Sequence, residues 1–298
     1  MFEFSMELLC PENWNDYELI DSGNFEKLER FGQYVTIRPE PQAVWDKSMQ
    51  PNEWEKTAHV KFIAQSSNSG IWKKNKTMPD QWDIKYKLDN TFLTFRLGLT
   101  SFKHVGLFPE QAVNWEFIFE SIKKFRSPEP KVLNLFAYTG ASSLAARAAG
   151  ATVTHVDSVK QVVNWAKDNA ASSRLDNIRW IVDDATKFVQ REIRRGSKYH
   201  GIILDPPAYG HGPEGENWKL ERDINNMLKG VKQILEPQEN FLILNTYSLG
   251  FSSIIVENLV KMIFPEHKNP SSGELYLPDK FGKKLPLGVF VKLFQSSQ

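Results

Sequence analysis

The sequence lacks the features of a secreted or membrane-bound protein. Its single cysteine, Cys10, cannot form an intramolecular disulfide, and a lone thiol fits a reducing compartment. No apolar run approaches the roughly 18 residues of a membrane span. The N-terminus, MFEFSMELLC, carries Glu3 and Glu7 where a signal peptide would be basic and then apolar. We therefore expect a cytoplasmic protein with no membrane partner.

The sequence also lacks a charge excess and a metal-binding pattern. It has 37 Lys and Arg residues against 36 Asp and Glu residues, and a net charge of +1 neither requires nor excludes nucleic acid. The 6 histidines are scattered without ligand spacing, and one cysteine cannot complete a site with them. No G-x-S-x-G elbow and no phosphate-binding G-x-x-x-x-G-K-[ST] loop occurs. We predict no metal site.

A further absence concerns the stretch KVLNLFAYTGASSLAARAAGATVTHVDS, residues 131–158, which indicates a strand, a turn, a helix, a strand and an acid. A dinucleotide site needs the glycines of G-x-G-x-x-G, but this turn has only Gly140, and Phe136 and Tyr138 would crowd a diphosphate. Asp157 follows the second expected strand, where a carboxylate can bind the hydroxyls of a ribose. The pattern favours an adenosine ligand without phosphate and with an amino-acid tail, which is S-adenosylmethionine. The alternatives are a simple helix cap at Asp157 and an NAD-type oxidoreductase.

The two parts of the chain have different patterns. Residues 1–110 contain short alternating segments such as 33–38 and 91–95, and they predict a small β-rich domain for substrate recognition. Five of the 9 tryptophans lie in this part, and they either pack its core or form a stacking surface for bases. These are Trp14, Trp45, Trp54, Trp72 and Trp82.

Residues 111–298 alternate between strand and helix patterns, which predicts a mostly parallel sheet covered on both faces. The expected strands are 132–136, 152–156, 178–182, 201–204 and 241–244, and the expected helices are 141–149, 160–172, 185–195 and 218–235. The tail GELYLPDKFGKKLPLGVFVKLF adds two strands as an antiparallel edge. The fold class is therefore α/β, with a Rossmann-like domain preceded by a smaller β-rich one.

Two more motifs place acids at the ends of strands in this second part. IRWIVDDATKF ends a strand with Asp183 and Asp184, where a carboxylate could accept the adenine amino group, or simply cap the next helix. GIILDPPAYG ends the next strand with Asp205, Pro206 and Pro207. Two prolines stop a helix and stiffen an extended turn, which suits a carboxylate that must meet a substrate in fixed geometry.

Together these motifs resemble class I S-adenosylmethionine-dependent methyltransferases, over roughly residues 100–295, and most closely the bacterial group that methylates large-subunit ribosomal RNA. HVGLFPEQ, residues 104–111, is similar to the segment that precedes the first strand in this group. The resemblance implies the ligand S-adenosylmethionine and a structured RNA, most closely ribosomal RNA, as substrate. It implies cofactor contacts from Phe108, Gln111, Asn134, Phe136, Ala137, Tyr138, Thr139, Gly140, Asp157, Ser158, Asp183, Asp184 and Asp205, with Asp157 at ribose, Asp184 at adenine and Asp205 bordering the target.

One departure from the resemblance concerns the acceptor atom. Methylation of a pyrimidine ring carbon needs a protein thiolate, but the segment FLILNTYSLGFSS has Tyr247 at about the position of that cysteine. A nitrogen of a ribosomal RNA base is therefore the expected acceptor, with Asp205, Pro206, Pro207 and Tyr209 as catalytic residues. In enzymes of exocyclic amines an aromatic residue follows Asp-Pro-Pro directly, whereas here Ala208 intervenes before Tyr209. A protein or small-molecule acceptor is the alternative.

Overall fold

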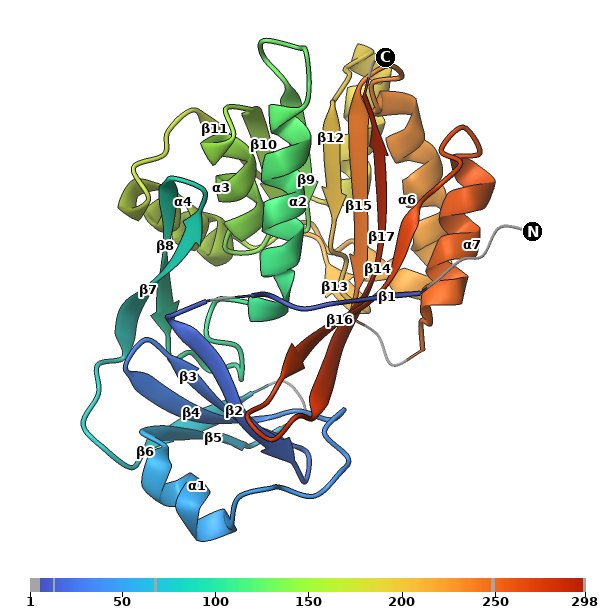
Figure 1. Ribbon diagram of the computed structural model, residues 1–298. Helices are drawn as coiled ribbons and strands as arrows, with labels where there is room; N and C mark the ends of the chain where they lie inside the picture. The colour runs from blue at the N-terminus through green and yellow to red at the C-terminus, as the bar shows by residue number, and fades with distance from the viewer. Residues whose placement is uncertain (1–5, 13, 67–68, 248–249, 297–298) are drawn as a thin grey trace. The chain divides into compact units, whose positions relative to one another are not determined.

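The computed structural model describes residues 6–12, 14–66, 69–247 and 250–296 (Figure 1). It divides into two compact units: residues 1–9, 113–275 and 288–298 form the larger, and residues 10–112 and 276–287 form the smaller. The sequence suggested a division into 1–110 and 111–298. The structure differs because strands pair across long sequence separations: β1 (Glu7–Leu9) lies parallel to β16 (Ser271–Pro278) in the larger unit, and the turn between the two tail strands belongs to the smaller.

The larger unit contains an eight-stranded sheet in the order β1-β16-β17-β15-β12-β9-β10-β11. Its further strands are β9 (Lys131–Leu135), β10 (Thr152–Asp157), β11 (Ile178–Val182), β12 (Gly201–Leu204), β15 (Asn240–Thr246) and β17 (Lys284–Gln295). Neighbours from β15 to β11 are parallel, and β17 is antiparallel to β15, as the sequence predicted. Strands β9, β10 and β11 each lead into a helix. Because β9, β10, β11 and β12 are parallel, their carboxyl ends meet at one edge.

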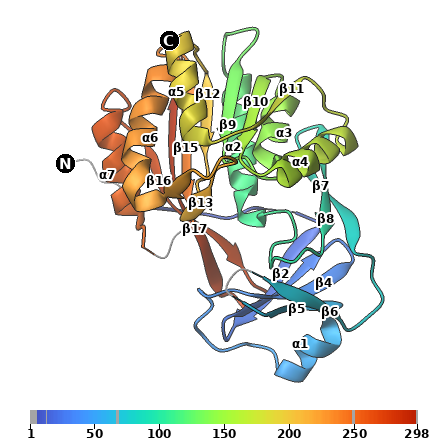
Figure 2. The same ribbon diagram turned by 180° about the vertical axis from the view of Figure 1, so that it is seen from behind.

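Helices cover both faces of this sheet. They are α2 (Ala112–Lys123), α3 (Ala141–Ala148), α4 (Lys160–Ser172), α5 (Ala185–Arg195), α6 (Leu220–Ile234) and α7 (Ser253–Ile263). Helix α2 lies over the face toward the viewer in Figure 1, and α5 and α6 lie over the opposite face, seen in Figure 2. Apolar side chains of α5, α6 and α7, including Phe188, Leu228 and Val260, pack with those of β9, β12 and β15 into one buried core. This core holds the carboxyl ends of the strands rigidly.

The smaller unit is built from β2 (Tyr17–Gly23), β3 (Glu26–Phe31), β4 (Tyr34–Pro39), β5 (Val60–Ala64) and β6 (Gly70–Lys74), which form one sheet in that order. A separate antiparallel ribbon pairs β7 (Gln81–Leu88) with β8 (Thr91–Gly98). Helix α1 (Pro51–Thr57) packs Trp54 into a core with Leu28 and Ile37. The alternating pattern of this part of the chain therefore predicted its β-rich character correctly.

The five tryptophans of the smaller unit serve its packing. None of them is exposed, and each indole N–H donates to an oxygen of the same unit. The acceptors are the carbonyls of Lys85, Ser22, Thr100 and Phe31 for Trp14, Trp45, Trp72 and Trp82, and the Asp21 carboxylate for Trp54. A buried indole with a satisfied N–H is a core residue. This arrangement favours packing over a surface on which bases stack.

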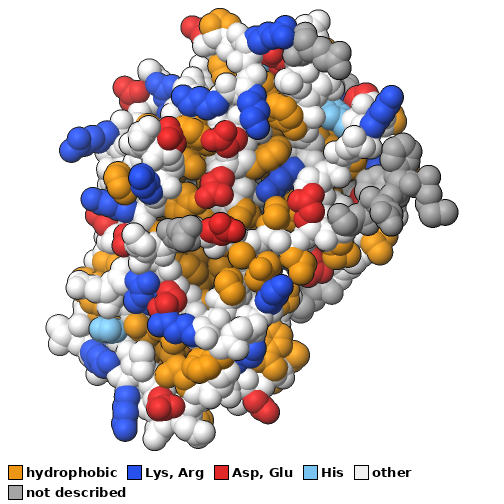
Figure 3. All heavy atoms as spheres, in the orientation of Figure 1, with side chains coloured by type: hydrophobic (Ala, Val, Ile, Leu, Met, Phe, Trp, Pro, Cys, Tyr) orange, Lys and Arg blue, Asp and Glu red, His pale blue; other side chains and the backbone are white. Residues whose placement is uncertain are grey.

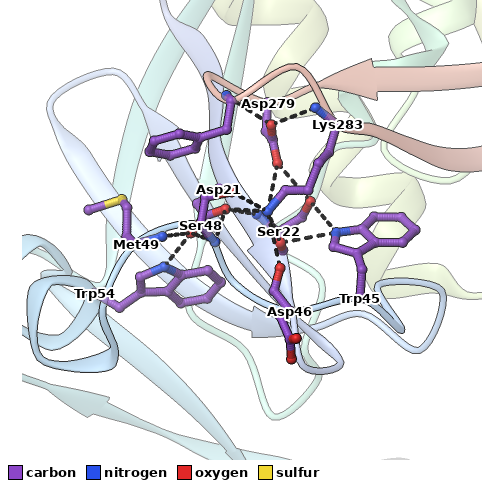
Figure 4. Close-up of polar contacts among 10 residues, drawn as sticks. Asp21, Ser22, Trp45, Asp46, Ser48, Met49, Trp54, Asp279 and Lys283 are labelled. Atoms are coloured by element: carbon purple, nitrogen blue, oxygen red, sulfur yellow. Dashed lines mark hydrogen bonds and ion pairs between the residues drawn. The ribbon is translucent and has the colours of Figure 1, made fainter.

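A polar cluster around Asp21 fastens the tail turn into the smaller unit (Figure 4). The fully buried Asp21 carboxylate accepts hydrogen bonds from Lys283 Nζ at 2.8 Å, Trp54 Nε1 at 2.8 Å and the Met49 backbone N–H at 2.9 Å. Burial raises the pKa of Asp21, but these hydrogen bonds outweigh it and lower the pKa below its usual value. Protein donors thus take the place of the water molecules that burial removes from the carboxylate oxygens.

The surface shown in Figure 3 carries both signs of charge side by side, without a broad basic field. Among the described residues, each helix is too short or too polar to span a bilayer. The same part of the chain brings no three His, Cys, Asp or Glu side chains together in a way that could hold a metal ion.

Candidate functional site

Polar residues gather at the carboxyl edge of the larger sheet. Asp157 ends β10, Asp183 follows β11, Asp205 follows β12, and Asn245 lies near the end of β15. These strands are parallel and in register with their neighbours, so their ends share one edge. The turn 136–140 leaves β9 in the middle of this row. The structure therefore brings together the acids that the sequence placed at strand ends.

The turn 136–140 has an unusual backbone. Phe136, Tyr138 and Gly140 all have positive φ, at 56°, 49° and 90°. For a bulky residue this conformation is strained, by about 1–2 kcal/mol each. Such strain persists only where surrounding contacts fix the backbone. The contacts that hold this turn come from β10 and α4.

Asp157 is one of the groups that hold this turn. Its Oδ2 accepts the Tyr138 backbone N–H at 2.9 Å, and its Oδ1 accepts the Val159 backbone N–H at 2.9 Å. Burial raises the pKa of Asp157, and these hydrogen bonds oppose the rise. The second bond resembles the simple cap that the sequence left open, whereas the first ties β10 to the turn. The Ser158 backbone N–H also donates to this carboxylate, whose predicted contact with a ribose hydroxyl stays a prediction.

Gly140 is required by packing as well as by its φ. A Cβ at this position would lie 2.9 Å from the Cβ of Ala166 on α4, which is too close. Glycine therefore lets the turn approach this helix closely. From the same helix the buried Asn169 donates its amide to the Thr139 carbonyl at 3.0 Å. The turn is therefore anchored to α4 as well as to β10. Ala137 and Thr139 are buried within it.

Asn134 is buried in the sheet and contacts α3. It is 2% exposed on β9, and its amide donates to Ser143 Oγ at 2.9 Å, which in turn meets His155 Nδ1 at 3.0 Å. Burial lowers the pKa of His155 to about 3, so its ring stays neutral. The Asn134 side chain thus joins α3 to the interior of the sheet. Its predicted cofactor contact stays a prediction.

The two acids after β11, Asp183 and Asp184, have different hydrogen-bond and ion-pair partners. Asp184 is the N-cap of α5, with its Oδ1 accepting the Lys187 backbone N–H at 2.8 Å. Asp183 forms an ion pair with Arg191 and accepts the Asp184 backbone N–H at 2.9 Å. Asp184 therefore has the capping role that the sequence left open. Its Oδ2 could still accept an adenine amino group, which stays a prediction, as does the contact from Ser158.

The Asp205 carboxylate accepts one hydrogen bond within the part of the chain that the structure describes. The donor is Nδ2 of the buried Asn245, at 2.8 Å from Asp205 Oδ1. Burial raises the pKa of Asp205 to about 6, and the hydrogen bond from Asn245 only partly opposes this rise. A carboxyl with such a pKa exchanges its proton near neutral pH. It is suited to act as a proton acceptor.

A short hairpin follows the Asp-Pro-Pro motif. Strand β13 (Tyr209–His211) pairs with β14 (Asn217–Lys219), and Trp218 Nε1 donates to the Pro207 carbonyl at 2.8 Å. The Trp218 ring also packs against Phe136, with 4.9 Å between ring centroids. Trp218 thus links the acceptor motif to the turn after β9. Tyr209 is 67% exposed and has Lys219 Nζ 5.8 Å from its ring centroid.

Two of the predicted residues belong to the other unit. Phe108 and Gln111 flank the short 3-10 helix Pro109–Gln111, and both lie in the smaller unit. Their predicted contact with the cofactor stays a prediction. Cys10 also lies in the smaller unit, where it hydrogen-bonds with Tyr276. The unit that carries Asp205 contains no cysteine.

The chemistry of this edge fits a nucleoside with an amino-acid tail better than a diphosphate. Asp157, Asp184 and Asp205 present acceptor oxygens, which suit hydroxyl and amino hydrogens and would repel phosphate. Phe136 and Tyr138 occupy the positions where a diphosphate needs glycine. The residues present therefore fit S-adenosylmethionine.

Three residues of this site were missed in the sequence: Asn169, Trp218 and Asn245. Asn245 could have been found, because it is a polar residue at the end of the apolar run Phe241–Leu244, the same signal that identified Asp157 and Asp205. Asn169 and Trp218 carry no such signal. Their role depends on contacts between α4, the hairpin and the turn that no local pattern predicts.

The comparisons with known proteins agree with this geometry. A family model described as S-adenosylmethionine-dependent methyltransferase matches residues 61–263. The crystal structure of the S-adenosylmethionine-dependent methyltransferase from Agrobacterium tumefaciens is similar, with 37% identity, a TM-score of 0.90, and coverage of 97% of this chain and 93% of that one.

Two curated relatives are named ribosomal RNA large subunit methyltransferase K/L. The one from Shewanella frigidimarina is 32% identical over 155 residues, which are 51% of this chain and 21% of that protein. The one from Pseudoalteromonas atlantica is 29% identical over 249 residues, which are 77% of this chain and 34% of that protein. The chain thus spans about a fifth to a third of the length of these relatives.

Proposed function

Because the chain belongs to the S-adenosylmethionine-dependent methyltransferase family and is an enzyme of that class, we propose that it methylates a nitrogen atom of a ribosomal RNA base. The names of the two curated relatives support ribosomal RNA as the substrate, with the base turned out of its stack. Action on this RNA also supports a cytoplasmic location. Membership of the family decides against the NAD-type oxidoreductase.

The observation that carries the proposal is the Asp205 carboxyl, with its raised pKa and one donor. S-adenosylmethionine supplies the methyl group when bound. Asp205 accepts a hydrogen bond from an N–H of the base, which directs the nitrogen lone pair, and takes the proton once the nitrogen carries the methyl group. A nitrogen needs no thiolate, and the only cysteine, Cys10, belongs to the other unit.

The residues after Asp205 supply the rest of the acceptor site. The Pro207 carbonyl already accepts Trp218 Nε1–H, so we assign the second acceptor for the base to the Pro206 carbonyl. Tyr209 is the exposed aromatic residue of the motif, and we assign base stacking to its ring. The Trp218 bond supports this assignment because it holds the hairpin that carries Tyr209.

Mass spectrometry of nucleosides from ribosomal and transfer RNA, in cells with and without the gene, tests this function. We expect one N-methylated nucleoside to disappear from large-subunit ribosomal RNA and to return with the wild-type gene but not with Asp205→Asn. If no methylated nucleoside is lost, RNA is not the substrate, and a protein or small-molecule acceptor takes its place. Loss of a C-methylated pyrimidine would contradict the nitrogen acceptor.

A further inference from the structure

Asn245 stands out among the residues that the sequence did not single out. It is 2% exposed near the end of β15, and its Nδ2 donates to Asp205 Oδ1 at 2.8 Å. Its own Oδ1 is buried and has no hydrogen-bond partner within the part of the chain that the structure describes. A buried, unpaired amide oxygen costs about 1–3 kcal/mol, so its presence beside Asp205 needs a reason.

The neighbouring strand is built to leave space for this amide. On β17, a Cβ added at Gly288 would lie 3.2 Å from Asn245 Oδ1 and 3.5 Å from Asn245 Nδ2. Any larger residue would have to push the amide group aside. The backbone of β17 thus fixes where the Asn245 amide can lie, and with it the side of Asp205 that receives the hydrogen bond.

An amide suits a carboxyl that gains and loses a proton. An ionised carboxylate only accepts hydrogen bonds, and the Asn245 N–H serves it. A protonated carboxyl donates through its O–H, and the Asn245 oxygen can receive that bond after the amide turns by half a rotation about its last bond. A lysine at this position could hydrogen-bond only to the ionised carboxylate, and an aliphatic residue could hydrogen-bond to neither form.

We propose that Asn245 is a positioning residue for Asp205, whose amide holds the carboxyl in one geometry in both protonation states. The inference rests on the proposed function, because it gives Asp205 the part of proton acceptor. It explains the unpaired oxygen as the acceptor that the protonated state requires. It also explains the glycine at position 288, which lets the amide approach.

No ionisable residue replaces Asn245 in this role. The ionisable residues on the hairpin and on the strands next to β12 and β15 are Lys131 on β9, Tyr209, His211 and Lys219 on the hairpin, and Lys284 and Lys292 on β17. The pKa of Asp205 is set by burial, which raises it, and by the Asn245 hydrogen bond, which lowers it, without a contribution from these groups. The amide is therefore the group through which this pKa can be changed.

Three variants test the inference. Asn245→Leu keeps the volume and removes the donor, so the pKa of Asp205 should rise by about one unit. Asn245→Asp places a second carboxyl beside the first, and the pair should titrate with a still higher apparent pKa. Gly288→Ala should displace the amide and raise the pKa by less than Asn245→Leu, without altering either partner.

Two readouts separate this inference from the proposed function. Carbon-13 NMR of the Asp205 carboxyl, assigned by its absence in Asp205→Asn, measures the pKa without substrate. The rate of methyl transfer to RNA against pH measures the same group during catalysis, and its acid limb should move upward with the NMR value. Asn240→Leu is the matched control, because it removes a buried amide at the opposite end of the same strand and should move neither.

The double variant Asp205→Asn with Asn245→Asp distinguishes positioning from mere packing. It keeps one amide and one carboxyl in contact, so thermal stability should recover relative to Asn245→Asp while methyl transfer stays lost. Recovery of the rate would overturn the inference, as would an unmoved NMR pKa in Asn245→Leu. A wild-type protein that methylates no RNA would refute the proposed function, whereas the NMR titration would still decide whether Asn245 sets the pKa of Asp205.

Discussion

Asp21 in the smaller unit is fully buried and Asp205 in the larger unit is half-buried, and the donors around them differ. The Asp21 carboxylate accepts hydrogen bonds from a lysine, an indole and three backbone N–H groups, those of Ser22, Ser48 and Met49 (Figure 4). Asp205 receives one amide. Burial raises the pKa of each, but the donors lower the pKa of Asp21 below its usual value, whereas Asp205 stays at about 6.

The difference shows how donor number separates a structural carboxylate from a reactive one. A carboxylate whose lone pairs are filled is stable as an anion and cannot take up a proton near neutral pH. A carboxylate with unused lone pairs is costly to bury, but it can accept a substrate hydrogen. The predictions below test whether the two residues differ in this way.

The largest effect is expected on stability in the smaller unit. Asp21→Ala removes one of the two buried carboxylates paired with Lys283, leaving only Asp279, and leaves several N–H groups unsatisfied. The free energy of unfolding should therefore fall by about 3 kcal/mol or more. Urea denaturation measures this. The control is Asp46→Ala, because the exposed Asp46 contributes only its backbone carbonyl to the cluster and should cost little. A loss below about 1 kcal/mol for Asp21→Ala would show that the cluster is incidental.

The next effect concerns the rate of methyl transfer. Asp205→Ala removes both the acceptor and the charge, and Asp205→Asn keeps one acceptor oxygen. Loss of a positioned proton acceptor should lower the rate by about a hundredfold or more, with alanine the more damaging. Single-turnover assays on RNA give the rate, and calorimetry should show nearly unchanged cofactor affinity. Full activity in Asp205→Asn would remove the carboxylate from the mechanism.

The same residue should affect stability in the opposite direction from Asp21. Its folded pKa of about 6 lies above its usual value of 3.8, so folding favours the protonated acid. This contribution is complete below about pH 4 and is lost as pH rises through about 6. At neutral pH, Asp205→Asn should therefore be more stable than wild type by about 1–2 kcal/mol. A difference between the two proteins that is the same from pH 4 to pH 7 would contradict the raised pKa.

A smaller effect is expected at Asp157. Asp157→Ala removes the predicted acceptor for ribose and the anchor of Tyr138, and cofactor affinity should fall by about tenfold. Titration calorimetry with S-adenosylmethionine measures this, with the exposed Asp176→Ala as control. Unchanged affinity would show that Asp157 only fastens the turn.

The smallest effect is expected at Cys10. Because Cys10 belongs to the smaller unit and a nitrogen acceptor needs no thiolate, Cys10→Ser should leave the rate of methyl transfer unchanged. A collapse of the rate, with a trapped covalent adduct in the wild type, would restore chemistry at a ring carbon.

Much of the fold could be predicted from the sequence, because periodicity is local. Strands β9, β10, β11, β12 and β15 and helices α3 to α6 lie within a few residues of the expected ranges. Short or distant pairings could not be predicted. Strands β13 and β14 have 3 residues each, which is too few for a periodic pattern, and β1 meets β16 across most of the chain. For that same reason the sequence could not show that each compact unit combines segments from both ends of the chain.

The site was predictable to a similar extent. Acids at strand ends could be found because the carboxyl ends of parallel strands converge. The sequence could not show which of them were already occupied. Asp183 is paired with Arg191, and Asp184 caps a helix. Asp205 accepts a hydrogen bond from Asn245 and has further lone pairs for a substrate. Whether a carboxylate already has a partner depends on tertiary contacts, which a local sequence pattern does not contain.

The most direct test of the central claim is the pH dependence of single-turnover methyl transfer to RNA. If Asp205 is the proton acceptor, the wild-type rate should fall tenfold per pH unit on the acid side, with a midpoint at about 6. Asp205→Asn should retain a low rate without this limb. A wild-type rate that is level from pH 5 to pH 8, or an Asp205→Asn variant with the same acid limb, would contradict the claim.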